Sequence, residues 1–285
     1  MIAKINNKIK KDGFKSLPNA ILTKIKSYIY KPNVMLEPYD IEMITLGTEY
    51  GGKRFFNFKE LENSTIISCG LGEDASFDIE FVSYYGGKVI ILDPTPRAIF
   101  HFNAIAQRIG EKSIREYSTQ GAQIVDAYDL SKINKGQLIL EKYALWTEKT
   151  TIKFFAPKNP THVSYSITNF QNNYSKDESF EHIEVESITL DSLLDKYNIK
   201  NIELLKLDIE GAEVKVIIDM LEKKIFPTQI AVEFDGFNFP SKKALDDYNK
   251  VDKLLRENSY LCYDFDGQAD FLYVLKNRIT KELDK

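Results

Sequence analysis

Short apolar runs alternate with amphipathic stretches along most of this chain. Apolar runs of about four to eight residues that are rich in β-branched and aromatic side chains are typical of buried strands, and apolar residues three or four positions apart are typical of helices. From residue 64 onward, runs of the first kind predict strands at 64–69, 88–92, 137–145, 183–186, 202–207, 230–234, 260–265 and 270–275. The stretches between them predict crossover helices, so the alternation indicates an α/β fold with a mostly parallel, doubly wound sheet.

The last two predicted strands are joined by a short turn at 266–267. A turn this tight joins antiparallel strands, so we expect the final strand to run against an otherwise parallel sheet. Two segments fit neither pattern: residues 32–63 predict a small cap or an extra β element, and the polar stretch 159–176 predicts a loop or hairpin over the open edge of the sheet. We therefore expect a helical N-terminal extension and cap at 1–59 and one α/β domain at 60–285.

Composition narrows the class of protein further. The 285 residues are 43% apolar, enough for one sizeable core, and the formal charge of -4 disfavours nucleic acid as a partner because phosphate binding needs a basic face. No run approaches the roughly 20 apolar residues that span a bilayer, and the N-terminus lacks an apolar signal core. The two cysteines, Cys69 and Cys262, have no Cys or His at the spacing of a zinc site. These features predict a cytoplasmic protein with reduced thiols.

The N-terminal 31 residues form a separate basic segment. They contain eight lysines and a single acid, Asp12, although the whole chain is negative. Isoleucines recur among the lysines at helical spacing, which suits either a helix packed on the domain or weak contact with an anionic membrane surface. The first interpretation is the commoner outcome for such a helix, and neither predicts an oligomeric state.

The most informative local motif is a glycine turn after the first strand of the domain. Gly70-Leu71-Gly72 follows the run at 64–69, precedes a helical pattern, and lies about 20 residues before Asp93, which ends the next strand. Glycines at this spacing let a ligand approach the backbone, and a carboxylate at the second strand end can accept hydrogen bonds from both ribose hydroxyls. The pair predicts a nucleoside site, although a plain tight turn or a dinucleotide site fits it as well.

Two acids beside the turn distinguish between these ligands. Glu73 and Asp74 place carboxylates at the start of the following helix, where the pyrophosphate of a dinucleotide needs bare amide groups. The sulfonium and ammonium groups of S-adenosylmethionine are cations, which acidic surroundings favour. The charges therefore predict S-adenosylmethionine rather than NAD.

A second acidic cluster follows a later strand. Asp208 and Glu210 lie where the run at 202–207 ends and a helix begins, and Glu233 and Asp235 end the next strand. The carboxyl ends of parallel strands line the ligand crevice of an open α/β sheet, so these four side chains are expected to face one site. Helix capping and binding of substrate hydroxyls explain them without a metal ion, and we predict none.

These motifs resemble those of the FkbM family of methyltransferases over roughly residues 60–275. The most specific piece, Lys-Leu-Asp-Ile-Glu-Gly-Ala-Glu at 206–213, is similar to a signature of that family nearly letter for letter, and supporting pieces lie at 93–96, 144–146, 164–167 and 231–235. The resemblance implies a class I methyltransferase fold, which is Rossmann-like, with S-adenosylmethionine as methyl donor. It also implies O-methylation of a small acceptor, usually a sugar or another polar metabolite of surface polysaccharides or secondary metabolism.

The first motif departs from the family pattern. Ser68 stands where many members have an acid, and Asp74 stands in place of a glycine. Glu73 or Asp74 is therefore expected to replace the missing carboxylate near the amino group of the donor.

The crevice and the resemblance together assign the candidate site. Methyl transfer to a hydroxyl gains from a base within hydrogen-bond reach, for which Asp208 is the first choice and His162 the second, with Glu210 facing the same site. Trp146 and Ala144 are candidates for the adenine contact, against the commoner alternative of core packing. The donor site is assigned to Gly70, Leu71, Gly72, Glu73, Asp74, Asp93, Pro94, Thr95, Ala144 and Trp146. The acceptor site is assigned to Ser164, Ser166, Asn169, Glu233 and Asp235.

Two other functions remain open at this level. A Rossmann-type sheet with this glycine turn also suits an NAD-dependent oxidoreductase or epimerase, which Glu73 and Asp74 disfavour. The basic N-terminus also suits a non-catalytic scaffold at a membrane.

Overall fold

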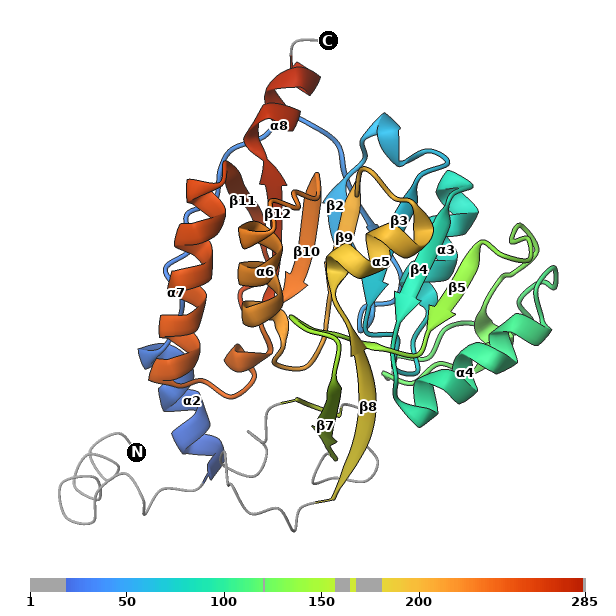
Figure 1. Cartoon of the computed structure of the whole chain (residues 1–285), viewed down its shortest axis with the longest axis horizontal. Helices are drawn as coiled ribbons and strands as arrows, with labels where there is room; N and C mark the ends of the chain where they lie inside the picture. The colour runs from blue at the N-terminus through green and yellow to red at the C-terminus, as the bar shows by residue number, and fades with distance from the viewer. Residues whose placement is uncertain (1–18, 120, 157–164, 168–180, 284–285) are drawn as a thin grey trace.

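The computed structural model describes residues 19–119, 121–156, 165–167 and 181–283. Its main sheet contains β3 (Thr65–Cys69), β4 (Lys88–Leu92), β5 (Leu138–Glu141), β9 (Leu204–Leu207), β10 (Gln229–Glu233), β11 (Tyr260–Phe265) and β12 (Asp270–Leu275). These seven strands lie in the order β11-β12-β10-β9-β3-β4-β5 (Figure 1). The five strands from β10 to β5 are parallel, whereas β12 is antiparallel to both of its neighbours. The predicted α/β class and the antiparallel final strand are confirmed.

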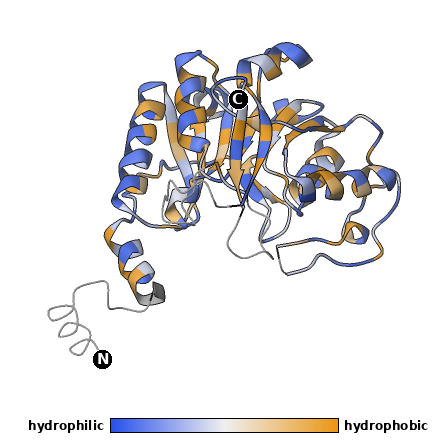
Figure 2. Ribbon diagram, turned by 60° about the horizontal axis from the view of Figure 1, so that its bottom comes forward, coloured by the Kyte–Doolittle hydropathy of each residue, from blue (hydrophilic) through white to orange (hydrophobic). Residues whose placement is uncertain are grey.

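Helices cover both faces of this sheet. On one face lie α5 (Leu190–Tyr197), α6 (Glu213–Glu222) and α7 (Lys242–Glu257), and on the other lie α3 (Ser76–Tyr85), α4 (Pro96–Gln107) and α8 (Lys276–Leu283). Because successive residues of a strand point to opposite faces, Ile67 of β3 packs with the first group and Ile66 with the second. Figure 2 shows apolar colour along much of the strands and mixed apolar and polar colour on the helices.

A hairpin from the predicted cap belongs to the same core. It consists of β1 (Met43–Leu46) and β2 (Lys53–Phe56), which pair antiparallel. Phe55 and Phe56 are fully buried with residues of α3 and β3. The backbone of Phe56 is also held by Gln229 of β10, whose amide accepts from its N–H and donates to its carbonyl. The domain division at 59/60 stays a prediction, but the hairpin packs directly on the sheet.

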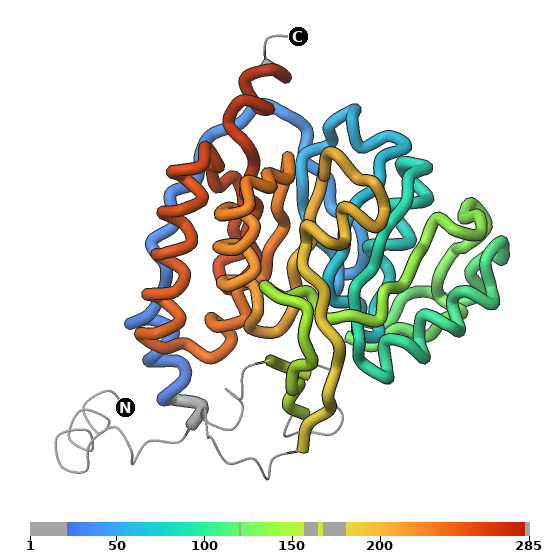
Figure 3. Tube along the Cα trace, viewed as in Figure 1, coloured from blue at the N-terminus to red at the C-terminus, as the bar shows by residue number. Residues whose placement is uncertain are grey.

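A smaller sheet lies beyond the carboxyl ends of the parallel strands. Its strands are β6 (Ala144–Leu145), β7 (Thr151–Phe155) and β8 (His182–Ile188), in the order β6-β8-β7. Figure 3 traces β8 from below the main sheet up to α5. The predicted strand 137–145 is therefore two strands, β5 and β6, which belong to different sheets. Most of the predicted loop at 159–176 lies outside the described residues, but Ser166 pairs with Phe155 of β7 through both backbone groups.

The N-terminal basic segment is described from α2 (Asn19–Ile29) onward. Leu22 and Ile25 are half-buried, whereas Tyr28 and Ile29 are exposed beside the exposed lysines of the helix. Across the described residues, no helix combines the length and the apolar character needed to cross a bilayer. Packing on the domain and contact with a membrane surface both stay predictions for this segment.

Candidate functional site

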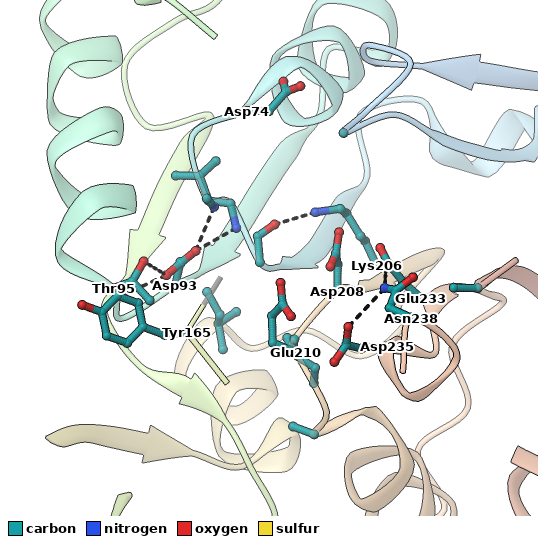
Figure 4. Close-up of a pocket in the computed structure, with 18 of the residues that line it drawn as sticks. Asp74, Asp93, Thr95, Tyr165, Lys206, Asp208, Glu210, Glu233, Asp235 and Asn238 are labelled. Atoms are coloured by element: carbon teal, nitrogen blue, oxygen red, sulfur yellow. Dashed lines mark hydrogen bonds between the residues drawn. The ribbon is translucent and has the colours of Figure 1, made fainter. Parts of the chain in front are cut away.

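A cavity of about 610 Å³ lies at the carboxyl ends of the parallel strands. Its walls come from the turns that follow β3, β4, β9 and β10, from the β1–β2 and β11–β12 turns, and from the small sheet. Among the described residues that line it, ten are acids and one, Lys206, is basic. Figure 4 shows Asp93 and Thr95 toward one end, Glu233, Asp235 and Asn238 toward the other, and Glu210 between them.

The glycine turn is held by the protein itself. Gly70 has a φ of +90°, and a Cβ on it would lie 1.9 Å from the backbone oxygen of Asp208. The Gly70 carbonyl accepts a hydrogen bond of 2.5 Å from Lys206 Nζ of β9. Glycine is therefore required here because the β9 backbone lies so close, which is a structural reason, whereas the sequence pattern had suggested close approach of a ligand.

Asp93 lines the cavity, as expected, but its oxygens are already engaged. Oδ2 accepts from the N–H groups of Leu71 and Gly72, at 3.0 and 2.9 Å. Oδ1 accepts from the N–H and hydroxyl of Thr95, at 2.9 and 2.6 Å. A carboxylate offers about four lone-pair positions, so a ribose hydroxyl can bond to Asp93 only in place of a present donor. The Thr95 hydroxyl is the donor that can rotate away.

The two acids after the turn have partners of their own. Glu73 is paired with Arg97 of α4, with Arg97 Nε 3.0 Å from Glu73 Oε1. Asp74 Oδ2 accepts from the Thr48 hydroxyl at 2.5 Å, and its Oδ1 accepts from Ser76 N at the start of α3. Arg97 offsets the charge of Glu73, so the repulsion expected against a pyrophosphate is weaker than the sequence indicated. Asp74 ties the β1–β2 turn to α3.

The acidic end of the cavity is built around Lys53. This β2 side chain is 4% exposed, and its Nζ lies 2.5 Å from Asp270 Oδ1 and 3.6 Å from both Asp208 Oδ2 and Glu233 Oε2. Glu233 and Asp270 are direct partners across β10 and β12. One ammonium group thus faces three carboxylates that come from three strands.

This arrangement shifts the pKa values of Asp208 and Glu233 in opposite directions. Burial acts to raise the pKa of Asp208, but Lys53 and Lys206 outweigh it and hold the pKa below its ordinary value. Burial, followed by the negative charge of Asp208, raises the pKa of Glu233 to about 7. Because a base works best when its pKa is near the working pH, Glu233 is better suited than Asp208 to accept a proton.

Asn238 holds Glu233 and Asp235 side by side. Its Nδ2 donates to Glu233 Oε1 at 2.9 Å and to Asp235 Oδ1 at 3.1 Å, and its own Oδ1 accepts from Gln268 Nε2. Asp235 is buried, and burial raises its pKa to about 6. The carboxylates at the ends of β10 are thus fixed in position by an amide network.

Glu213 does not line the cavity, but it holds the turn after β9 in place. Its Oε1 accepts from the N–H groups of Ile209 and Gly211, so it shapes the turn that presents Asp208 and Glu210. Glu210 adopts a φ of +52°, and its carbonyl accepts from the buried Ser166 hydroxyl. Glu213, the first residue of α6, thus stabilises the turn that precedes this helix.

Replacing Glu213 by glutamine tests its protonation. Burial, followed by the charge of Asp235, raises its pKa from 4.5 to about 8. Between these values the folded state binds a proton that the unfolded state has released, so the folding stability that the group contributes is complete at low pH and is lost as pH rises through about 8. Glu213→Gln keeps the Oε1 acceptor and cannot ionise. Its melting temperature should fall less than that of the wild type between about pH 5 and pH 8.

The matched control is Glu222→Gln, an exposed position on the same helix. Thermal melting curves at a series of pH values should show that this variant follows the wild type. Parallel pH dependence for the wild type and Glu213→Gln would contradict a raised pKa at Glu213.

Most of the sequence-assigned residues meet at this cavity. Those that line it are Gly70, Leu71, Gly72, Glu73, Asp74, Asp93, Pro94, Thr95, Ala144, Asp208, Glu210, Glu233 and Asp235. Trp146 is not among the lining residues: its backbone N–H donates to Ile188 O, and its partly buried ring packs against the core with Lys215 Nζ 4.8 Å from the ring centroid, as the core-packing alternative predicts. Ser166 is buried beside the cavity, and His162, Ser164 and Asn169 lie outside the described residues.

Sequence reasoning missed several residues of the acidic end. Lys53 comes from the segment at 32–63, which has no clear periodicity, so no local signal marks it. Asp270 had a usable signal, because the first residue of an antiparallel final strand lies at the carboxyl edge of its parallel neighbours. No group of three or more His, Cys, Asp or Glu side chains within the described part of the chain has the arrangement of a metal site.

The fold and the cavity by themselves define a class of protein. A glycine turn after one strand, an acid after the next and a crevice where the strand order reverses, between β3 and β9, are typical of α/β enzymes that bind nucleosides. Residues 49–262 match the methyltransferase FkbM domain, which is three-quarters of the chain, so the protein belongs to the FkbM methyltransferase family. Comparisons with curated proteins and with solved structures gave no match. The resemblance noted in the sequence is confirmed, and the protein is a methyltransferase.

Proposed function

We propose that this chain is an S-adenosylmethionine-dependent O-methyltransferase of the class I fold that acts on a sugar or another small polar metabolite. The observation that carries the proposal is the division of one cavity into two chemically different ends. Asp93 and Thr95 lie at the first end, and apolar Ala144 and Leu145 line the same cavity, which suits a nucleoside. The acids at the second end suit a sulfonium and an ammonium group.

The glycine turn argues against a dinucleotide as the ligand. Dinucleotide sites bind pyrophosphate through bare backbone N–H groups at the start of the helix. Here the N–H groups of Leu71 and Gly72 already donate to Asp93. A pyrophosphate would compete with a carboxylate for them, which favours the methyl donor over the NAD-dependent alternative.

When bound, S-adenosylmethionine supplies a methyl group on a sulfonium, which passes to a nucleophile by in-line displacement. The residues of the chain contribute the base and its positioning. Glu233 accepts the proton of the acceptor hydroxyl as the oxygen–carbon bond forms, and Asn238 holds its carboxylate in place. Lys53 keeps Asp208 ionised beside it. We therefore assign the base to Glu233 in preference to Asp208, the first choice from the sequence.

Calorimetry with S-adenosylhomocysteine tests the donor site. The wild type should bind this product, and Asp93→Ala should lose at least about tenfold in affinity, or about 1.4 kcal/mol, because it removes four hydrogen bonds that hold the turn and Thr95. Asp247→Ala, on the outer surface of α7, is the control and should bind as the wild type does. Failure of the wild type to bind S-adenosylhomocysteine, or a thermal shift with NAD instead, would overturn the proposal.

A further inference from the structure

The α2 helix has an apolar face bordered by lysines. At about 100° per residue, its apolar side chains share a sector about 120° wide: Leu22, Ile25, Tyr28 and Ile29. Lys24 and Lys26 lie at the two borders of this sector, and Thr23 and Ser27 occupy the opposite side of the helix. The helix is therefore amphipathic, with positive charge on both sides of its apolar face.

Part of this apolar face is open to solvent. Tyr28 is 75% exposed and Ile29 57%, whereas Leu22 and Ile25 are half-buried. Among the residues that the structure describes, none of these four belongs to the apolar clusters on the two faces of the main sheet or on the small sheet. Adjacent exposed apolar side chains with a charged border are typical of a surface that binds a partner. The domain leaves Tyr28 and Ile29 uncovered.

The lysines beside this face are available to a partner. Lys24, Lys26 and Lys31 are exposed, and none of them forms an ion pair with another described residue. The 31-residue segment that contains α2 has eight lysines and one acid, so the charge around the helix is positive although the whole chain is negative. This charge is complementary to a surface of anionic lipid headgroups. Nucleic acid would also meet the lysines, but it would leave Ile29 without an apolar partner.

We propose that α2 binds the surface of an anionic phospholipid membrane. Tyr28 and Ile29 enter the boundary between headgroups and acyl chains, and Lys24, Lys26 and Lys31 contact the headgroup phosphates. With 11 residues the helix is too short to cross a bilayer, so it lies in the plane of the surface. This binding goes beyond the proposed methyl transfer and does not depend on it.

The position of α2 gives this binding a consequence for the cavity. Figure 1 and Figure 3 show α2 at the same end of the molecule as β7 and β8. The small sheet of β7 and β8 lies beyond the carboxyl ends of the parallel strands, where the cavity is. A membrane-bound α2 therefore holds the cavity end of the domain near the lipid surface.

Co-sedimentation of the full chain with lipid vesicles tests this surface. The vesicles consist of phosphatidylcholine alone or of an equal mixture of phosphatidylcholine and phosphatidylglycerol. Partitioning at about 0.1 M salt should be at least about tenfold stronger on the anionic vesicles, and it should weaken at about 0.5 M salt, where charges are screened. The double variants Tyr28→Ser/Ile29→Ser and Lys24→Gln/Lys26→Gln should each weaken it at least about tenfold.

Two double variants elsewhere on the domain are matched controls. Phe100→Ser/Ile114→Ser removes an aromatic side chain and an isoleucine that are 78% and 72% exposed. Lys132→Gln/Lys135→Gln removes two exposed lysines and thus the same net charge as the α2 variant. Both controls should bind the vesicles as the wild type does. Thermal melting of all four variants checks that a loss of binding does not reflect unfolding.

Several outcomes would overturn the proposal. They are no binding, equal binding to the two kinds of vesicle, and sedimentation without vesicles, which would mean that a second copy of the chain covers the helix. Binding that survives in Tyr28→Ser/Ile29→Ser, or that falls equally in the controls, would overturn the assignment to α2. Because neither donor nor acceptor is present in the assay, these results are separate from a failure to bind S-adenosylhomocysteine.

Discussion

Replacement of Gly70 by alanine is expected to abolish binding of S-adenosylhomocysteine and to destabilise the protein by about 4 kcal/mol, or about 10 °C in melting temperature. The physical reason is a direct clash, because the new Cβ would lie 1.9 Å from the Asp208 carbonyl oxygen and the residue has a φ of +90°. Either the turn or the Asp208 peptide must move. Both line the cavity, so the donor site and the acidic end would be displaced together.

Gly110→Ala is the matched control for this variant. Gly110 has a φ of +94°, but a Cβ there meets nothing within 4 Å. Its free energy of unfolding should fall by only about 1–2 kcal/mol, because a residue with a side chain is disfavoured in the left-handed region. It should keep S-adenosylhomocysteine binding. Thermal melting and calorimetry measure both effects. Equal losses in the two variants would show that the contact between the turn and β9 is not what requires glycine.

Replacement of Lys53 by methionine is expected to destabilise the protein by about 3 kcal/mol at about pH 8 and by much less at about pH 5. The ammonium faces Asp208, Glu233 and Asp270, and removing it leaves three carboxylates close together with no counter-charge at their centre. Burial and mutual repulsion then raise their folded-state pKa values above the unfolded ones. The folded state binds protons more tightly, so stability is retained at low pH and lost as pH rises through those values.

Lys53→Arg separates charge from shape. It keeps a positive charge at the same position and should follow the wild-type pH dependence, even if the larger group lowers stability by a constant amount. Urea unfolding at about pH 5 and pH 8 provides the comparison for the wild type and both variants. A loss for Lys53→Met that is the same at both pH values would mean that the side chain acts by packing alone.

Strands buried on both faces were the easiest elements to predict. The runs at 64–69 and 202–207 became β3 and β9 with small changes at their ends, because a central parallel strand leaves an uninterrupted apolar run. The run at 137–145 was predicted as one strand and is two, β5 and β6, separated at 142–143. Apolar pattern alone cannot detect such a division, because both halves are buried in different sheets.

The sequence predicted where the charged residues of the site lie, but not which groups they pair with. Glu73 was read as an uncompensated acid, yet Arg97 pairs with it from the next helix. Asp93 was expected to accept hydrogen bonds from a ribose, yet it already accepts them from Thr95 and from the glycine turn. Trp146 was a candidate for adenine, yet its ring packs under Lys215.

The sequence by itself determined the α/β class, the antiparallel last strand, the family, and the placement of acids after β3, β4, β9 and β10. Those properties depend on local periodicity, turn residues and short motifs, all of which involve residues that are close together in the chain. Only the tertiary structure decided that Lys53 lies among Asp208, Glu233 and Asp270, the last of them 217 residues away. It also decided that one buried oxygen of Asp235 has no hydrogen-bond partner among the residues that the structure describes. Which charged groups interact depends on their distance in space and on their burial. A sequence pattern shows neither, because it relates only residues that are close together in the chain.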